Sequence, residues 1–261
     1  ESVHERPLLV VPPQINKFYV FDLSPEKSLA RFLLRSQVQT FVVSWRNPTK
    51  AQREWGLSTY IEALKEAIDV ICAITGSKDV NMLGACSGGI TISSLLGHYA
   101  ALGEKKVNSM TLLVSVLDTK LDTQVALFAD EKTLEAAKRR SYQSGVLEGK
   151  DMAKVFAWMR PNDLIWNYWV NNYLLGNEPP VFDILYWNAD TTRMTAKLHR
   201  DFVDALAGRG GAASFLQTPG WAAVKPEWRA ESLGFVVGGE LRGVALVLYG
   251  AGAGFGAPRR Y

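Results

Sequence analysis

The residues from Gly84 to Gly88 carry the clearest chemistry in this sequence. They form a G-x-C-x-G motif, which is the spacing of a nucleophile elbow with cysteine in the serine position. A thiolate at the tip of such a turn can attack an acyl carbon, and the glycines allow the tight bend that exposes it. The next backbone amide, that of Ser87, would form half of an oxyanion hole. We therefore predict Cys86 as a nucleophile and Ser87 as an oxyanion donor.

The flanking segments have the order that an elbow requires. Residues 79–83 read as a strand, and residues 89–99 read as an apolar helix. The start of that helix also favours the thiolate form of Cys86. A small buried thiol is the alternative interpretation of this cysteine. The strand, elbow and helix order favours the nucleophile.

Strand and helix signals alternate over residues 1–117. Strands are expected at 8–11, 40–45 and 107–117, and helices at 25–36 and 57–75, with Ser24 as the N-cap of the first helix and Gly76 ending the second. This alternation predicts an α/β fold with a parallel sheet and helices on both faces. The elbow would lie within this core.

Residues 118–206 depart from this pattern and are predicted to form a cap over the site. Helical stretches at 131–141 and 151–159 precede an aromatic-rich segment. We expect its rings mainly to pack within the core and cap, and a wide apolar lid suits an apolar substrate. The aromatic residues are Trp158, Trp166, Tyr168, Trp169, Tyr173, Phe182, Tyr186 and Trp187.

Residues 207–261 have a foreign composition. They contain no Asp, Asn, His or Ile, they are rich in Gly and Ala, and Arg outnumbers Lys. This aberrant tail is typical of a shifted reading frame in a GC-rich gene. A genuine ending, with strands near 236–237 and 244–248, is the alternative. Because the chain opens almost directly on a buried-type strand, we also expect that sequence upstream is missing.

The composition argues against several classes of function. The 261 residues carry a formal net charge of +3, which is too small to indicate a nucleic-acid partner. The two cysteines do not form a disulfide framework, and a reducing cytoplasm suits a working thiolate. Cys72 lies in a helical segment and is expected to pack in the core. No segment reads as a signal peptide, a membrane span or a metal-ligand cluster.

A general base for Cys86 is hard to find among the three histidines. His98 follows Cys86 by 12 residues on one predicted helix, which places it about 18 Å along the axis. His4 precedes the first strand, and His199 lies in the helix that leaves the cap. Asp118 follows the strand after the elbow helix, where a turn or cap role is expected.

The second oxyanion donor should come from the loop after the first strand. Pro12 and Pro13 have no N–H and cannot donate. The amides of Val11, Gln14 and Ile15 remain candidates, with Val11 favoured because it ends the strand.

Several segments resemble the polyhydroxyalkanoate synthases. They are residues 11–19 (VPPQINKFY), the elbow 84–89 (GACSGG), residues 160–173 (RPNDLIWNYWVNNY) and residues 186–194 (YWNADTTRM). The resemblance covers about residues 1–206 and is nearest to the class II, medium-chain-length branch.

This resemblance implies an α/β-hydrolase core that polymerises (R)-3-hydroxyacyl-CoA and releases CoA. Cys86 would carry the growing chain as a thioester. The enzymes of this family work in the bacterial cytoplasm at the surface of a polyester granule, and a homodimer is expected for the intact protein. The acyl-CoA is a substrate, and no cofactor is implied.

The family completes a Cys, Asp, His triad with two loops downstream of the cap. Neither loop is present here, because the last Asp is Asp204 and the last His is His199. We therefore expect an incomplete chain that is inactive as written. Two alternatives stay open: a cysteine hydrolase resembling dienelactone hydrolase, which shares the G-x-C-x-G-G elbow, and a non-catalytic fragment.

Overall fold

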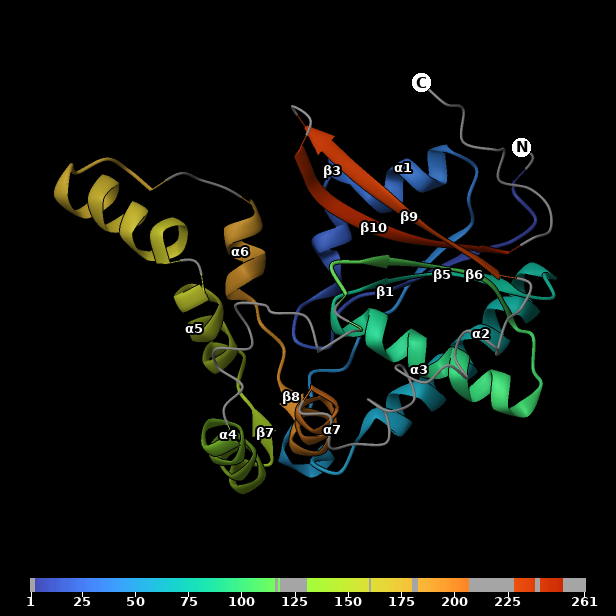
Figure 1. The fold of residues 1–261 in the computed structure, drawn as a ribbon, viewed down its shortest axis with the longest axis horizontal. Coiled ribbons are helices and arrows are strands. Elements are labelled where there is room, and N and C mark those ends of the chain that lie inside the picture. The colour runs from blue at the N-terminus through green and yellow to red at the C-terminus, as the bar shows by residue number, and fades with distance from the viewer. Residues whose placement is uncertain are drawn as a thin grey trace.

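Four parallel strands form the central sheet, in the order β4–β1–β5–β6 (Figure 1). The computed structural model describes residues 3–115, 117, 131–159, 161–179, 183–206, 228–237 and 240–250. The sheet strands are β1 (Leu8–Val11), β4 (Thr40–Val42), β5 (Val80–Ala85) and β6 (Val107–Leu113). β1 and β5 have neighbours on both sides and are largely buried, and β1 reads as a continuous apolar run, while β5 includes Asn81.

Helices cover both faces of this sheet. α2 (Leu57–Thr75) and α3 (Ser87–Leu102) lie on one side, and α1 (Leu29–Arg35) lies on the other (Figure 1). Each helix connects two strands of the sheet, which is the arrangement that parallel pairing requires. The predicted α/β fold is confirmed.

α2 shows how the sequence sets an element. Its buried positions Leu57, Tyr60, Leu64, Ile68 and Ile71 follow one another at three or four residues, so they share one face. The helix ends at Gly76, whose φ of 70° is left-handed. Both features agree with the prediction for residues 57–75.

The main hydrophobic core lies between the sheet and the pair α2 and α3. It is formed by residues of these two helices and of β1, β5 and β6, with Val11, Ile68 and Ile92 fully buried. Cys72 packs against this core, as predicted.

The predicted helix at residues 25–36 is wrong at its start. Asp22–Ser24 (β2) and Lys27–Ser28 (β3) pair as a short antiparallel hairpin, so Pro25 lies in its turn. Ser28, rather than Ser24, caps α1, because its Oγ accepts a 2.8 Å hydrogen bond from the Arg31 amide. Proline suits both a helix start and a turn, and the sequence pattern did not separate them. Two short 3₁₀ helices, η1 (Phe18–Phe21) and η2 (Lys50–Gln52), complete the connections.

The elements after residue 130 form a separate group beside the sheet (Figure 1). They are α4 (Glu131–Ser144), β7 (Val146–Leu147), α5 (Gly149–Met159), the π-helices η4 (Asn162–Trp166) and η5 (Trp169–Leu174), α6 (Asp183–Ala189), β8 (Met194–Thr195) and α7 (Ala196–Leu206). A second apolar cluster, in which Leu198 and Phe202 of α7 meet Leu57 and Tyr60 of α2, attaches this group to the core.

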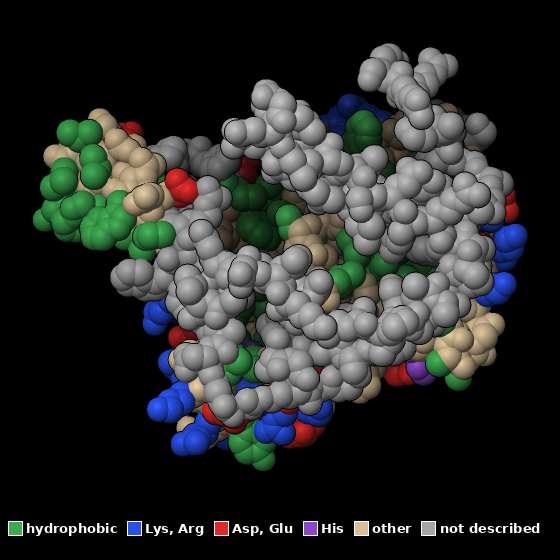
Figure 2. Space-filling model, viewed as in Figure 1, with side chains coloured by type: hydrophobic (Ala, Val, Ile, Leu, Met, Phe, Trp, Pro, Cys, Tyr) green, Lys and Arg blue, Asp and Glu red, His purple; other side chains and the backbone are tan. Residues whose placement is uncertain are grey.

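η4 and η5 form an arm that extends away from the sheet (Figure 1). Apolar side chains gather on it at the left of Figure 2. Trp166 is 52% exposed and Tyr173 is 70% exposed, while Trp169 and Tyr173 stack with ring centroids 4.3 Å apart. Tyr186 of α6 is also exposed. The expectation that the aromatic residues mainly pack within core and cap is wrong for these side chains, since an amphipathic pattern does not say which face is covered.

Strands β9 (Trp228–Val237) and β10 (Glu240–Gly250) form an antiparallel hairpin above the sheet (Figure 1). They include the positions expected to be strands near 236 and 244–248. Residues 207–227 and 251–261 lie outside the described part of the chain, and the reading-frame shift stays a prediction. Among the described helices, none combines the length and apolarity needed to cross a membrane.

Candidate active site

Cys86 stands at a strained turn between β5 and α3. Its φ of 52° and ψ of −121° lie outside the usual regions for a residue with a side chain. Two hydrogen bonds hold the turn against the end of β6: the Cys86 amide donates to Leu113 O at 2.9 Å, and Ser115 Oγ donates to Cys86 O at 3.1 Å. The predicted elbow is present.

The elbow glycines are required by close packing. A Cβ on Gly88 would lie 2.3 Å from the carbonyl oxygen of Val11 and 2.8 Å from that of Pro12. A Cβ on Gly89 would lie 1.9 Å from Ser115 Oγ. Only glycine lets α3 approach the loop after β1 and the end of β6 so closely.

The Cys86 side chain borders an apolar cavity of about 610 Å³. The core contributes Pro13, Ile15 and Asn16 from the loop after β1, with further lining from η1, the elbow and the end of β6. This volume lies within the usual range of small-molecule sites. A thiol at the wall of such a cavity can meet an acyl chain that lies inside it.

The predicted cap segment also lines the cavity, with Met152 and Ala153 of α5 and Trp187 of α6. Trp187 is held in place by its Nε1, which donates to Lys17 O at 2.7 Å. The Thr192 amide donates to Ile15 O at 2.9 Å, which joins the segment between α6 and β8 to the loop after β1. Among the described side chains of the predicted aromatic lid, Trp187 borders the cavity, while Phe182 and the side chain of Trp158 lie outside the described part of the structure.

Burial sets the acidity of the thiol. It raises the pKa of Cys86 above its ordinary value, and a hydrogen bond from the Ser87 backbone N–H lowers the pKa by less. The helix start acts in the predicted direction, because its first backbone N–H lowers the pKa, but desolvation has the larger effect. Activation of this thiol needs a proton acceptor or a change of environment on substrate binding.

The predicted oxyanion donors take different places. Ser87 begins α3 beside the sulfur, while Val11 is fully buried in β1 and pairs with Gly84. The backbone N–H of Gln14 donates to Ser87 Oγ at 3.3 Å, so this candidate donor already has a partner. Ile15 borders the cavity. Ser87 and Val11 stay predictions as donors.

No described histidine borders the cavity. His98 is near the C-terminal end of α3, where its Nε2 lies 3.2 Å from Lys65 Nζ of α2. His4 precedes β1, and its backbone N–H donates to Gln37 O. Asp118 lies outside the described residues. Within the described residues, the cavity lining holds no carboxylate or imidazole, and no group of side chains could bind a metal ion.

His199 has a structural partner. Its Nδ1 lies 2.8 Å from Ser141 Oγ, between α7 and α4. Burial, and then the charge of Lys138, lower the pKa of His199 below its usual value of 6.5. Lys138 itself pairs with Asp204 at 2.8 Å. His199 therefore belongs to the packing of α4 on α7.

This burial predicts acid destabilisation of the α4–α7 contact. Because the folded chain holds His199 neutral while the unfolded chain protonates it near pH 6.5, its contribution to stability is present above that pH and is lost as the pH falls below it. Urea unfolding between pH 7.5 and 5.5 should show a loss of stability that is smaller in His199→Gln. Equal slopes for both proteins would contradict this assignment.

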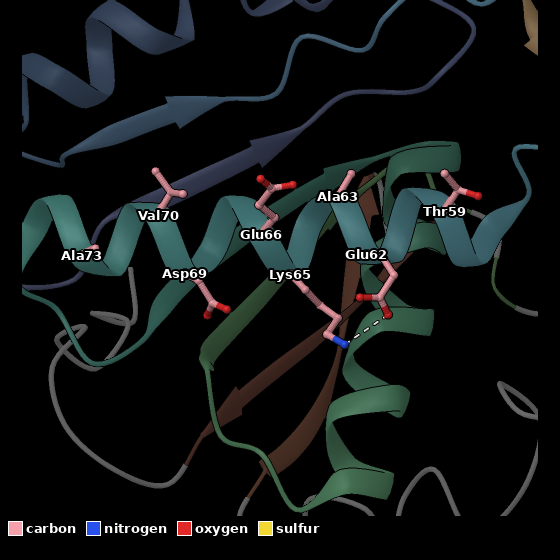
Figure 3. A pocket seen from close by; sticks show the side chains of 8 residues that line it. All are labelled: Thr59, Glu62, Ala63, Lys65, Glu66, Asp69, Val70 and Ala73. Atoms are coloured by element: carbon pink, nitrogen blue, oxygen red, sulfur yellow. Dashed lines mark hydrogen bonds and ion pairs between the residues drawn. The ribbon is translucent and has the colours of Figure 1, made fainter. Parts of the chain in front are cut away.

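A second hollow, of about 790 Å³, lies along the outer side of α2. Figure 3 shows Glu62, Glu66 and Asp69 along it, with Lys65 bonded to Glu62 at 3.1 Å. Its lining comes from α2 alone and includes no elbow residue. It offers a solvated acidic face, and the candidate active site is the cavity at Cys86.

Sequence reasoning missed a buried polar ring beside the elbow, formed by Gln14, Ser87 and Thr91. Ser115 was missed as well. The available signal was weak: Thr91 lies four residues after Ser87, which places both on one face of α3.

A family model described as the alpha/beta hydrolase fold matches residues 7–208. The chain belongs to the alpha/beta hydrolase fold family. The central parallel sheet and the elbow at its centre agree with this membership. Among solved structures, a putative lipase from Sulfolobus solfataricus matches 75% of this chain and 66% of its own, with 15% identity and a TM-score of 0.47.

Two curated relatives of this alpha/beta hydrolase are poly(3-hydroxyalkanoate) polymerases from Ectopseudomonas oleovorans. Polymerase 1 is 81% identical over 204 residues, which make up 78% of this chain and 36% of the relative. Polymerase 2 is 60% identical over 205 residues, which make up 78% of this chain and 37% of the relative. The resemblance to polyhydroxyalkanoate synthases is confirmed. The chain spans a little over a third of the length of these relatives.

Proposed function

We propose that this chain carries the nucleophile half of an acyltransferase that polymerises (R)-3-hydroxyacyl-CoA. The observation that carries the proposal is the Cys86 thiol, held at the elbow and facing an apolar cavity between core and cap. The identity to polymerases of the same reaction class supports it.

The proposed reaction has two steps at one sulfur. The Cys86 thiol gives its proton to solvent and the thiolate attacks the thioester carbonyl of the acyl-CoA. The bond from that carbon to the CoA sulfur breaks, and CoA leaves as a thiolate that takes a proton from solvent. The hydroxyl group of a second 3-hydroxyacyl unit then attacks the Cys86 thioester, forms an ester and returns the cysteine. The Ser87 amide, with Val11 as the second predicted donor, would stabilise the oxyanion in both steps.

The environment of the thiol favours a hydroxyl acceptor over water. Phe21, Met152 and Trp187 are among the apolar residues that border the cavity. A largely apolar enclosure limits the water around a thioester, which protects it from hydrolysis. It also suits an acyl chain of medium length.

The exposed arm suggests how the protein meets its product. Trp166, Val170 and Leu174 are among the large apolar side chains that it presents to solvent. Exposed apolar patches of this kind mark contacts with other macromolecules or apolar surfaces. We propose that the intact protein works at the surface of a polyester granule in the cytoplasm and that it forms a homodimer.

The fate of the acyl group tests the proposed function against hydrolysis. The intact protein that contains this chain and, separately, the chain as written are incubated with (R)-3-hydroxydecanoyl-CoA labelled in the acyl group, and CoA, protein-bound label, ester oligomer and free acid are measured. For the intact protein the proposal predicts a protein-bound thioester that passes to added 3-hydroxyacyl units as ester. The chain as written lacks the Asp and His loops and is expected to show no turnover. Free hydroxy acid as the dominant product would support a cysteine hydrolase, and the absence of bound label would support a non-catalytic fragment.

A further inference from the structure

A closed ring of hydrogen bonds lies directly behind the elbow. The backbone N–H of Gln14 donates to Ser87 Oγ at 3.3 Å, and Ser87 Oγ donates to the side-chain oxygen Oε1 of Gln14 at 2.7 Å. Gln14 Nε2 donates to Thr91 Oγ1 at 2.8 Å, and Thr91 Oγ1 donates to Ser87 O at 3.0 Å. Gln14 is 1% exposed, Ser87 7% and Thr91 0%.

The ring joins two segments that meet only through the fold. Gln14 belongs to the loop after β1, while Ser87 and Thr91 form the first turns of α3. The same loop is tied to the next strand region, because Trp45 Nε1 donates to Pro12 O at 2.8 Å. The loop is therefore hydrogen-bonded both to α3 and to the segment that follows β4.

Buried polar groups favour one geometry over many. Breaking a ring bond would leave a buried donor or acceptor unsatisfied, so small shifts of the loop against α3 are costly. An apolar side chain at position 14 could fill the same space without this directional constraint. The ring thus holds the backbone of Ser87 in register with the loop that must supply the second oxyanion donor.

We propose that Gln14 is a positioning residue that holds the Ser87 amide in place beside the Cys86 sulfur. The proposal deepens the function proposed above, since an oxyanion hole works only when its donors already point at the place where negative charge develops. Gln14 acts through Ser87 and does not touch the substrate.

Two reactions of the Cys86 thiol distinguish a positioning role of Gln14 from a purely structural role. Acylation by p-nitrophenyl acetate passes through a tetrahedral oxyanion, whereas alkylation by iodoacetamide does not. Both rates are measured on the full 261-residue chain in a Cys72→Ala background, which leaves one cysteine. Gln14→Met, of similar size, should lower the maximum acylation rate about tenfold or more, with the alkylation rate changing less than about threefold.

The matched control is Ser109→Ala, which removes a 2.7 Å hydrogen bond to Asn81 on the same sheet but away from the elbow. It should leave the ratio of acylation to alkylation unchanged. Thr91→Val is the second variant, in case Gln14→Met does not fold, and it should lower the same ratio about threefold.

Three results would overturn the proposal: equal loss of both rates in Gln14→Met and Thr91→Val, no loss in either variant, or an unsubstituted thiol that p-nitrophenyl acetate does not acylate. The probe does not depend on CoA. Failure of the acyl-CoA assay with the intact protein, together with an unchanged effect on p-nitrophenyl acetate, would therefore reject the proposed function and keep the positioning role.

Discussion

Cys86→Ala is expected to abolish covalent acylation of the intact protein by 3-hydroxyacyl-CoA, with a fall of at least about a thousandfold in protein-bound label. The sulfur at the elbow borders the described cavity, where Thr191 supplies a hydroxyl group, a far weaker nucleophile than a thiolate, and no other described cysteine, serine or lysine lines it. Mass spectrometry of the intact chain measures the bound acyl group directly.

Cys72→Ala is the matched control for this substitution. Cys72 is the second free thiol, and burial raises its pKa as it does for Cys86. It packs against the main core, away from the cavity, so its loss should keep the acyl label. Label that persists in Cys86→Ala and disappears in Cys72→Ala would reject the elbow as the site of chemistry.

Gly88→Ala is expected to destabilise the fold by about 3 kcal/mol and to disrupt the elbow. The added Cβ would meet two backbone carbonyl groups, those of Val11 and Pro12, at 2.3 and 2.8 Å. Backbone cannot rotate away as a side chain can, so α3 and the loop after β1 must separate. Urea unfolding gives the free-energy change, and the rate of Cys86 alkylation reports the disruption.

Gly103→Ala separates steric contact from backbone strain. Gly103 ends α3 with a φ of 71°, and a Cβ there would meet nothing within 4 Å. Its replacement should cost about 1 kcal/mol through strain alone and leave Cys86 reactivity unchanged. A Gly88→Ala protein as stable as Gly103→Ala would show that the close approach of α3 to the loop is not required.

The local elements followed from the sequence where one pattern dominated. The apolar spacing and final glycine of α2, and the strand, elbow and helix order around Cys86, each allow one arrangement. The start of α1 did not follow, because Pro25 suits a hairpin turn as well as a helix start. The reading of the arm rings as buried failed because composition does not show which apolar faces find a partner.

The features of the candidate site also divide into those that followed from the sequence and those that did not. Cys86 and the need for glycine at position 88 were contained in a motif of five adjacent residues. The raised pKa of Cys86, the pairing of His199 with Ser141 and the ring at Gln14 were not, because each depends on burial or on contacts between residues far apart in the chain.

The sequence by itself determined that a thiol stands at a turn between a strand and a helix, because short-range sterics and glycine spacing decide such a turn. Only the tertiary structure decided what surrounds that thiol: the cap side chains across the cavity, the carbonyl groups against Gly88 and the buried ring behind Ser87. The physical reason is that desolvation and hydrogen-bond geometry arise when distant segments pack together, and no local pattern encodes those distances.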